Sequence, residues 1–520
     1  MSKLYRDILY LIIEELQYDK KSLVSCLTIN KIWCEIIIPI LWKNPWEDLT
    51  FDKEKLLLNT IISHLSDEER NNLSQYSKIS YKKPLFNYIS FCKHLNLEII
   101  ENIILSHGQG QYNEIKNYIL NLFINKNAEY THLYMPNYYY EYNLIPEAEQ
   151  CFSKIKFLRC DSRVKDNSLA ILTKMCKSIE DLELIIYKYE NNFGIPKLIE
   201  NQENLINVSF LHKYSPYDGL FRAFLENSLI KHANTIQYFN ICGQLETQIL
   251  TSFVNLKDLV LMGDWERWIF IENLSLPSLQ SLYTREINTE SLKGLIENSG
   301  GKLNELNISY SVIFPDAIST KEIIQVIYHN CPNLTHLEFY YKNCNVLDLE
   351  KLLIKCQYLK ILGIYYNVED EFMNWDNLFN ILVTSSPLSL HKLKIIHPVN
   401  PPELKSLKLF FDNWEGRKPI SLIISIEGDF IRKKQLNDLI GNYKSKGVVK
   451  DFIHYSYEYD DLIESKAKEI VKDLKTRDAN GRFGSVSVLK PRFSAETELT
   501  AKPTDKTELQ NRSQNYCKIE

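Results

Sequence analysis

A short apolar pattern that recurs at a nearly constant interval constrains this chain more than any other feature of its sequence. The pattern is apolar–x–x–apolar–x–apolar, and it occurs eleven times between residues 130 and 395. Ten intervals span 260 residues, so the period averages 26 residues. The patterns begin at Tyr130, Ile155, Ile179, Leu205, Ile236, Leu256, Leu279, Leu303, Leu334, Leu359 and Leu390.

Each pattern is typical of a β-strand with one buried face, because apolar and polar positions alternate at its end. Helical stretches lie between the patterns; five of them are Ser168–Cys176, Glu290–Asn298, Lys321–Asn330, Leu347–Cys356 and Asn377–Ser385. A single repeat buries too few side chains to offset the entropy of ordering about 25 residues, whereas stacked repeats share one core. The sequence therefore predicts an α/β solenoid with a curved parallel sheet.

A period of roughly 20–29 residues is that of leucine-rich repeats, which this region resembles. The segment Cys331-Pro332-Asn333-Leu334 is similar to a junction common in the repeats of F-box proteins, and Cys176 and Cys356 stand at the same offset. The asparagine that often ends the family's strand motif is mostly missing here, with Asn367 as the one good match. The exact register of the repeats therefore stays open.

The first 46 residues show a different pattern, that of three short helices. Apolar residues recur at helical spacing up to about residue 17, Asp19 can cap a second helix, and a third begins after Asn30. We expect the chain to bend at Pro39, which lacks an N–H donor. Because a unit below about 40–60 residues is marginal, it cannot bury all of its apolar surface. The stripe expected to await a partner is Ile8, Leu9, Ile12, Leu16 and Trp42.

This N-terminal stretch resembles an F-box. Three sub-motifs fit in order: an apolar helix after Leu4, a middle segment with Leu23 and Trp33, and Leu41-Trp42-Lys43 at the close. Two residues depart from the family, with Tyr5 in place of a proline and Asn30 in place of a cysteine. The resemblance implies docking on a Skp-type adaptor through Leu4, Ile8, Leu9, Ile12, Leu16, Leu23, Trp33, Leu41 and Trp42. An ordinary helical cap on a larger domain is the alternative.

The sequence predicts five segments along the chain. They are an F-box at 1–46, a helical linker at 47–127, a leucine-rich-repeat solenoid at 128–430, a C-terminal helical cap at 431–475 and a disordered tail at 476–520. We expect a last strand at Ser421–Ile426 and closing helices at Phe430–Tyr443 and Tyr457–Leu474, because a terminal repeat needs a cover. The tail is poor in apolar residues.

Composition narrows the setting in which the protein works. With 66 acidic and 61 basic residues the net charge is −5, which gives no long-range attraction to nucleic acid. No run reaches the roughly 18 apolar residues of a spanning helix, and no signal-peptide pattern occurs. Eleven scattered cysteines without a Cys-x-x-Cys pair read as reduced thiols. We therefore expect a cytoplasmic or nuclear protein with neither nucleic-acid nor membrane partners.

No motif of a catalytic, metal or phosphate site occurs in the chain. Its eleven histidines form no His-Glu-x-x-His, and there is no Gly-x-x-x-x-Gly-Lys and no Gly-x-Ser-x-Gly. We therefore expect no cofactor, no metal and no enzymatic activity.

The predicted solenoid instead offers the concave face of its sheet for binding. Tyrosine and arginine, which are enriched in binding hot spots, occur between the buried strand positions. Two tryptophans follow one strand in a turn, where they either contact a partner or cover the protein's own loops. The predicted substrate contacts are Tyr238, Asn240, Trp265, Trp268, Tyr283, Arg285, Glu338, Tyr340 and Tyr365.

A docking unit at one end and a repeat surface at the other indicate an adaptor. The resemblance implies the substrate-recognition subunit of an SCF-type cullin-RING ubiquitin ligase. Such a subunit holds a protein substrate, here unidentified, near the ubiquitin-carrying enzyme, and it accelerates ubiquitin transfer by proximity alone. One alternative is a repeat scaffold without a ubiquitin role. Another is an enzyme with an unrecognised site in residues 47–125 or in the loops, which predicts a deep pocket with converging polar groups.

Overall fold

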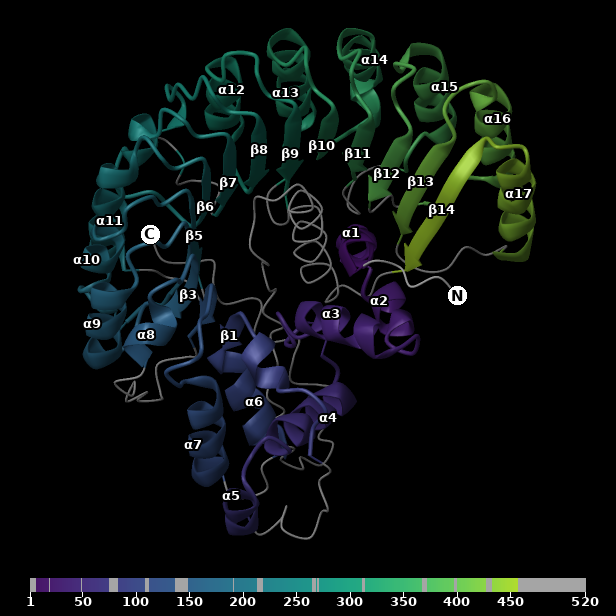
Figure 1. Cartoon of the computed structure of the whole chain (residues 1–520). Coiled ribbons are helices and arrows are strands. Elements are labelled where there is room, and N and C mark those ends of the chain that lie inside the picture. The colour runs from purple at the N-terminus through teal and green to yellow at the C-terminus, as the bar shows by residue number, and fades with distance from the viewer. Residues whose placement is uncertain are drawn as a thin grey trace, which may run out of the picture.

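The protein is an open horseshoe whose inner side is a parallel sheet and whose outer side is a row of helices (Figure 1). The computed structural model describes residues 6–456 except 18, 48, 74–82, 108–111, 136–147, 190, 213–217, 264–267, 269–270, 311–313, 367–371, 397–399 and 427–432. The predicted α/β solenoid with a curved parallel sheet is confirmed. Predictions for Leu4, Trp265, Asn367, Tyr457–Leu474 and the tail 476–520 concern residues outside these ranges.

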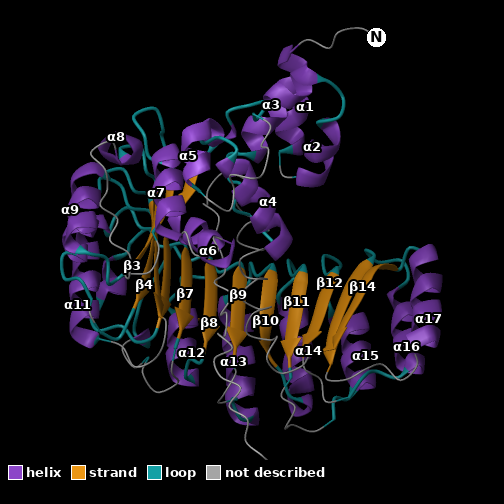
Figure 2. Cartoon of the chain, turned by 90° about the horizontal axis from the view of Figure 1, so that it is seen from below, coloured by secondary structure: helices purple, strands orange, loops and turns teal. Residues whose placement is uncertain are grey.

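Three helices form the N-terminal unit, as predicted: α1 (Arg6–Leu16), α2 (Lys20–Cys26) and α3 (Lys31–Leu41). The Asp19 carboxylate caps α2 by accepting from the Ser22 N–H at 3.2 Å, and the Asn30 side chain caps α3 by accepting from the Ile32 N–H at 2.9 Å. Helix α3 does not end at Pro39 but continues to Leu41. In Figure 2 the three helices project beyond the edge of the sheet.

A helical block follows, with α4 (Phe51–Ile62), α5 (Asp67–Asn72), the 3-10 turn η1 (Tyr88–Phe91), α6 (Leu97–His107) and α7 (Tyr112–Phe123). It also contains the first strand of the sheet, β1 (His94–Asn96), which the prediction had placed in a purely helical linker. The pattern was missed because buried Cys92 takes the first apolar position, ahead of Leu95 and Leu97. The solenoid therefore begins earlier than residue 128.

All eleven predicted patterns coincide with strands, and the sheet pairs fourteen described strands in sequence order. After β1 they are β2 (His132–Tyr134), β3 (Phe157–Asp161), β4 (Asp181–Ile186), β5 (Asn207–His212), β6 (Tyr238–Cys242), β7 (Asp258–Met262), β8 (Ser281–Arg285), β9 (Glu305–Ser309), β10 (His336–Tyr340), β11 (Ile361–Tyr365), β12 (Lys392–Ile396), β13 (Ile420–Ile426) and β14 (Val449–Ser456). Strand β13 matches the expected last strand. Strand β14 extends the sheet into the segment predicted as a helical cap.

Helices cover the outer face of the sheet. They are α8 (Ala148–Phe152), α9 (Asp166–Met175), α10 (Ile195–Glu200), α11 (Gly219–Ser228), α12 (Thr289–Glu297), α13 (Ala317–Asn330), α14 (Val346–Lys355), α15 (Trp375–Ser385), α16 (Leu404–Trp414) and α17 (Lys433–Ser445). The five predicted helices correspond to α9 and α12–α15. Cysteines cap α9, α13 and α14, and the Cys356 thiol lies 3.8 Å from the carbonyl of Cys331. Burial raises the pKa of both these thiols to about 12, so they pack as neutral groups.

A regular ladder of backbone hydrogen bonds joins each repeat to the one before it. At the start of each strand from β2 to β12, two successive N–H groups donate to one carbonyl of the preceding repeat, as Lys156 and Phe157 do to Thr131. The ladder starts at the Lys43 carbonyl, which accepts from Lys93 and His94 at 2.9 and 3.2 Å. A single apolar core runs from Trp46 to Val449, whereas the N-terminal unit has a small core of its own.

Candidate protein-binding surfaces

The N-terminal unit buries part of the stripe that was expected to be exposed. Leu9 (3% exposed) and Leu23 (0%) pack with Ile13, Ile36 and Ile37 in the core between its three helices. Leu16, Trp33 and Leu41 pack half-buried against that core. The prediction that Leu9 belongs to an exposed stripe is therefore wrong, because α2 and α3 cover it, and Leu23, which was expected to contact an adaptor, is buried in the same core.

Another face of α1 is apolar and open to solvent. Ile8 is 46% exposed, Ile12 is 37% exposed, and Leu11, which was not predicted, is 63% exposed. The three lie at positions i, i+3 and i+4 of the helix and therefore share one face. The sequence could have indicated Leu11, because α1 has further apolar residues besides Leu9 and Ile13, which are the ones buried in the core. Val24, Ile29 and Ile32 of the same unit are exposed as well.

Two tryptophans fix the N-terminal unit to the solenoid. Trp42, predicted to contact an adaptor, instead stacks on Tyr88 with ring centroids 4.8 Å apart. Trp46 is buried, its Nε1–H donates to the carbonyl of His94 at 2.6 Å, and its ring lies 5.6 Å from that of Phe123. Together with the Lys43 carbonyl, these contacts hold the unit in one orientation on the first repeat.

Two histidines stack beside this junction. The rings of His94 on β1 and His132 on β2 are 3.7 Å apart and nearly parallel. Burial lowers the pKa of His94 to about 2 and that of His132 to about 4, so both are neutral near pH 7. The concave face therefore begins, at β1 and β2, with two stacked neutral rings and not with charged side chains.

The concave face carries most of the predicted substrate contacts, at varying depth. Asn240, Tyr283 and Arg285 are half-buried on β6 and β8. Four more side chains on this face are buried: Tyr238 (8% exposed), Glu338 (3%), Tyr340 (3%) and Tyr365 (8%). Trp268 is only 1% exposed and belongs to the main core, so its prediction as a partner contact is wrong.

Glu338 is the centre of a hydrogen-bond network that crosses four strands. Its Oε1 accepts from the Lys394 ammonium of β12 at 2.8 Å and from the His336 ring at 2.9 Å. Its Oε2 accepts from the Tyr365 hydroxyl of β11 at 2.5 Å and from the Asn307 amide of β9 at 3.0 Å. Sequence reasoning placed Glu338 on the concave face but not Lys394, which contacts it from 56 residues away.

Gly363 makes this network possible. It lies on β11, between its two register partners, Glu338 of β10 and Lys394 of β12. A Cβ at this position would lie 2.5 Å from Cγ of Glu338, so only glycine lets that side chain cross the strand. Burial alone would raise the pKa of Glu338, but the hydrogen bond from His336 and the charge of Lys394 outweigh it and lower the pKa. The carboxylate is therefore ionised.

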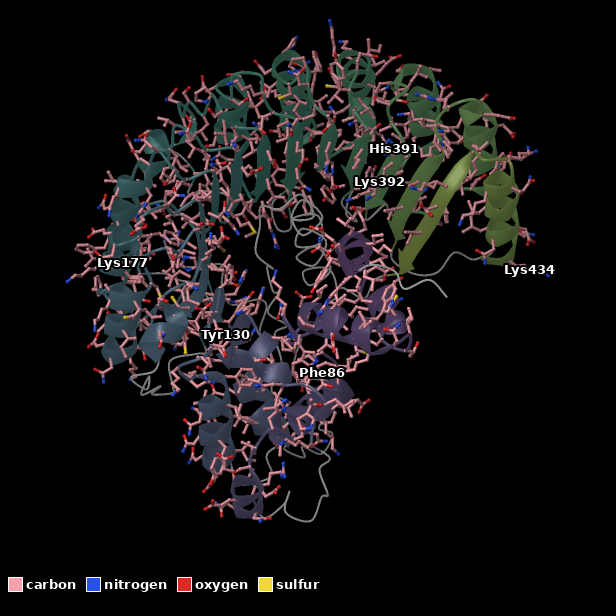
Figure 3. The ribbon with its side chains drawn as sticks, in the orientation of Figure 1. Phe86, Tyr130, Lys177, His391, Lys392 and Lys434 are labelled. Carbon is pink, nitrogen blue, oxygen red and sulfur yellow. The ribbon has the colours of Figure 1, made fainter. Side chains whose placement is uncertain are left out.

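A cavity of about 1180 Å³ opens in the helical block, where the α4–α5 connection, the segment before η1 and the end of α7 meet. Phe86 and Tyr130, which both line it, are labelled in Figure 3. Its other walls include His64, Asp67 and Glu129. His64 is committed to structure, since its Nδ1 donates to the Thr60 carbonyl at 2.8 Å and its Nε2 accepts from the Tyr88 N–H at 3.2 Å. These contacts form no nucleophile–base pair.

Within the residues that the structure describes, no group of three or more His, Cys, Asp and Glu side chains is arranged to hold a metal ion. Among the helices given above, none combines the length and apolar character needed to cross a membrane.

Solved structures with a similar fold include a repeat protein. A leucine-rich-repeat-containing protein, LegL7 from Legionella pneumophila, is similar at 14% identity with a TM-score of 0.33, over 57% of this chain and 91% of that one. No protein-family model matches the sequence, and no curated protein matches it.

Proposed function

We propose that this protein is the substrate-recognition subunit of an SCF-type ubiquitin ligase. In this proposal the N-terminal unit docks on a Skp-type adaptor of the cullin complex, and the concave face of the repeats binds a protein substrate. The chain itself catalyses nothing, and it acts by raising the local concentration of a target lysine.

The observation that carries the proposal is the exposed apolar face of α1. Ile8, Leu11 and Ile12 form one face of a helix in a unit whose own core is already complete without them. Exposed apolar faces of this kind mark interaction sites. The adaptor surface is therefore assigned to these three residues rather than to Leu9 and Trp42.

The rigid junction supports the same role. The unit is attached to the first repeat by the stacking of Trp42 and by the hydrogen bonds of Trp46 and Lys43. A partner bound to α1 would therefore keep a constant orientation toward the concave face. A fixed geometry suits an adaptor, because proximity accelerates a reaction only when the reacting groups are held at a suitable distance.

Affinity purification of the full-length chain with a Skp-type adaptor tests the proposal. Leu11→Asp combined with Ile12→Asp is expected to abolish co-purification, because two charges would be buried at the interface. Ile318→Asp combined with Leu347→Asp is the matched control, since both residues are exposed apolar positions on outer helices. Adaptor retained by the α1 variant, or lost equally in the control, contradicts the proposal.

A repeat scaffold without a ligase role is the second candidate. It is favoured by the absence of any matching family model for the N-terminal unit. It predicts that wild-type protein co-purifies with protein partners but with neither adaptor nor cullin, and mass spectrometry of the purified complexes separates the two candidates.

A further inference from the structure

The turns that lead into the last four strands of the sheet are strongly basic. Here a turn means the seven residues that end at the first residue of a strand. Before β3–β10 the turns are balanced, with Lys154, Lys156, Lys177, Lys257 and Lys302 against Glu180, Asp181, Glu203, Asp258 and Glu305. Before β11–β14 they contain Lys355, Lys360, Lys392, Arg417, Lys418, Lys444 and Lys446 against Glu415. A chain with a net charge of −5 therefore has a positive region where its last strands begin.

Six of these basic residues lie along one rim of the sheet. We use the name basic rim for Lys355, Lys360, Lys392, Lys418, Lys444 and Lys446. The strands are parallel, so their amino ends all lie at the same rim, which is the one beyond which the N-terminal unit projects (Figure 2). Arg417 is not included, because its guanidinium donates to four backbone carbonyls around the end of α15.

The charges of the basic rim are accessible. Five of its lysines are exposed, and Lys392, labelled in Figure 3, is half-buried. None of the six ammonium groups forms an ion pair with a residue that the structure describes. In the balanced turns, by contrast, Lys154 and Lys156 pair with Glu129 and Glu180 at 2.8 and 2.7 Å. The basic rim therefore presents its positive charge to a partner.

Two carboxylates lie beside the basic rim and leave its charge positive. Glu415 is exposed in the turn before β13. Asp451 of β14 accepts a hydrogen bond from the Ser421 hydroxyl at 3.1 Å and directly follows Lys450. Six lysines outnumber these two groups, so complementarity favours an anionic partner.

The side chains of this rim favour carboxylates of a protein over phosphates of a nucleic acid. Tyr358 is 61% exposed and Leu388 is 75% exposed, and their turns adjoin, since the Ser389 hydroxyl donates to the Gln357 carbonyl at 3.1 Å. Exposed apolar groups of this kind suit a partner with apolar side chains. Bidentate recognition of phosphate favours arginine, and the one arginine of these turns is already bonded.

We propose that the basic rim binds an extended protein segment in which glutamate or aspartate alternates with small and apolar residues, an inference that rests on the proposed substrate-binding function. Neighbouring turns are separated by about 4.8 Å on the strand side and by roughly 8–10 Å on the helix side. Every second residue of an extended chain lies on the same side, at intervals of about 6.6 Å. That interval falls between the two spacings, so successive carboxylates meet lysines of successive turns.

Fluorescence anisotropy with the full-length protein and labelled peptides tests this proposal. The first probe is Ser-Glu-Leu-Glu-Ser-Glu-Leu-Glu-Ser-Gly, and the second has glutamine in place of each glutamate. Only the first is expected to bind. Lys360→Gln combined with Lys418→Gln is expected to weaken its binding roughly tenfold, because two opposed charges are lost.

Two controls separate this surface from general attraction between charges. Lys197→Gln combined with Lys321→Gln removes two exposed lysines of the outer helices α10 and α13 and is expected to leave binding unchanged. A labelled oligothymidylate of the same charge is expected to bind more weakly than the first peptide. Circular dichroism confirms that each variant is folded. Absence of binding by the glutamate peptide, equal binding by the oligothymidylate, or equal weakening in both variants overturns the proposal.

Adaptor co-purification of the same variants separates this inference from the proposed function. The Lys360→Gln/Lys418→Gln protein is expected to retain the adaptor, because both lysines lie outside the N-terminal unit. Peptide binding without any adaptor would leave the basic rim valid and contradict only the ligase role.

Discussion

At the scale of single residues, Glu338 shows how a repeat sequence places an ionised carboxylate inside a sheet. Gly363 provides the space for it, and Lys394 and His336 supply the stabilising contacts. Such a pair is costly to break from one side, because the charge that remains loses its partner.

Replacing Glu338 by glutamine is expected to destabilise the protein at pH 7 by about 3–5 kcal/mol, because the charge of Lys394 then lacks its carboxylate. The folded-state pKa of Glu338 is lowered, so its stabilisation is present above the ordinary value near 4.5 and is lost as the pH falls toward the folded-state pKa. The difference between wild type and Glu338→Gln in urea unfolding is therefore expected to shrink from pH 7 to pH 3.5.

A second substitution serves as the control for that measurement. Adding Lys394→Met to Glu338→Gln removes both charges and is expected to recover part of the lost stability at pH 7. Unfolding curves of wild type and Glu338→Gln that stay equally separated at both pH values would contradict an ionised Glu338.

Residue-level prediction from sequence had a clear limit. The alternation of apolar and polar positions was enough to place Tyr238, Asn240 and Glu338 on the concave face. It could not pair Glu338 with Lys394, because such pairing depends on a register three repeats long. It also misplaced Trp268, since a tryptophan in a turn can point either way.

At the scale of elements, the first strand and the tryptophans that precede it decide how the N-terminal unit is held. Strand β1 is three residues long, and its attachment to the unit uses the Lys43 carbonyl and the indole N–H of Trp46. The helical block predicted as a separate linker is therefore part of the solenoid, since it contains the first strand of the sheet.

Replacing Trp46 by phenylalanine is expected to destabilise this junction by about 0.5–1.5 kcal/mol, because the buried His94 carbonyl loses the indole donor and keeps only the Cys92 thiol at 3.1 Å. Hydrogen exchange measured by mass spectrometry should then accelerate in η1 and β1. Trp33→Phe is the control, since Trp33 packs within the N-terminal unit and should affect exchange there alone. Unchanged exchange in residues 88–96 of Trp46→Phe would contradict the role of the indole.

Elements were predicted well wherever the repeat pattern was complete. Eleven strands and five helices follow from apolar spacing alone, because each has leucine or isoleucine at the expected positions. Strand β1 escaped because Cys92 takes an apolar position, and β14 escaped because Val449–Ser456 directly follows a helix in a segment interpreted as a cap. The exposed face of α1 was predicted in part, for Ile8 and Ile12.

At the scale of the whole molecule, a single core joins repeats whose strands each pair with the strands beside them. Such a chain is stabilised by local interfaces that add along its length, so damage to one repeat is felt most by the repeats beside it. The core of the curved array in Figure 1 is elongated, so we expect stability to be lost locally rather than in one step.

Replacing Leu306 of β9 by alanine is expected to reduce local stability by about 2–5 kcal/mol, because the side chain is 1% exposed in the core. Hydrogen exchange should accelerate most in β8–β10 and progressively less toward β4 and β13. Leu388→Ala, at a position that is 75% exposed, is the control and should change nothing. Uniform acceleration across all repeats would contradict independent local interfaces.

The position of the Lys43 carbonyl also bears on self-association. An open parallel sheet normally offers two unpaired borders, and each can template the addition of a strand from another molecule. Here the N–H groups of Lys93 and His94 at the β1 border donate to the Lys43 carbonyl, and the His94 carbonyl accepts from the Trp46 indole, so the N-terminal unit occupies this border. End-to-end growth into filaments is thereby blocked at that border, and detachment of the unit would expose it.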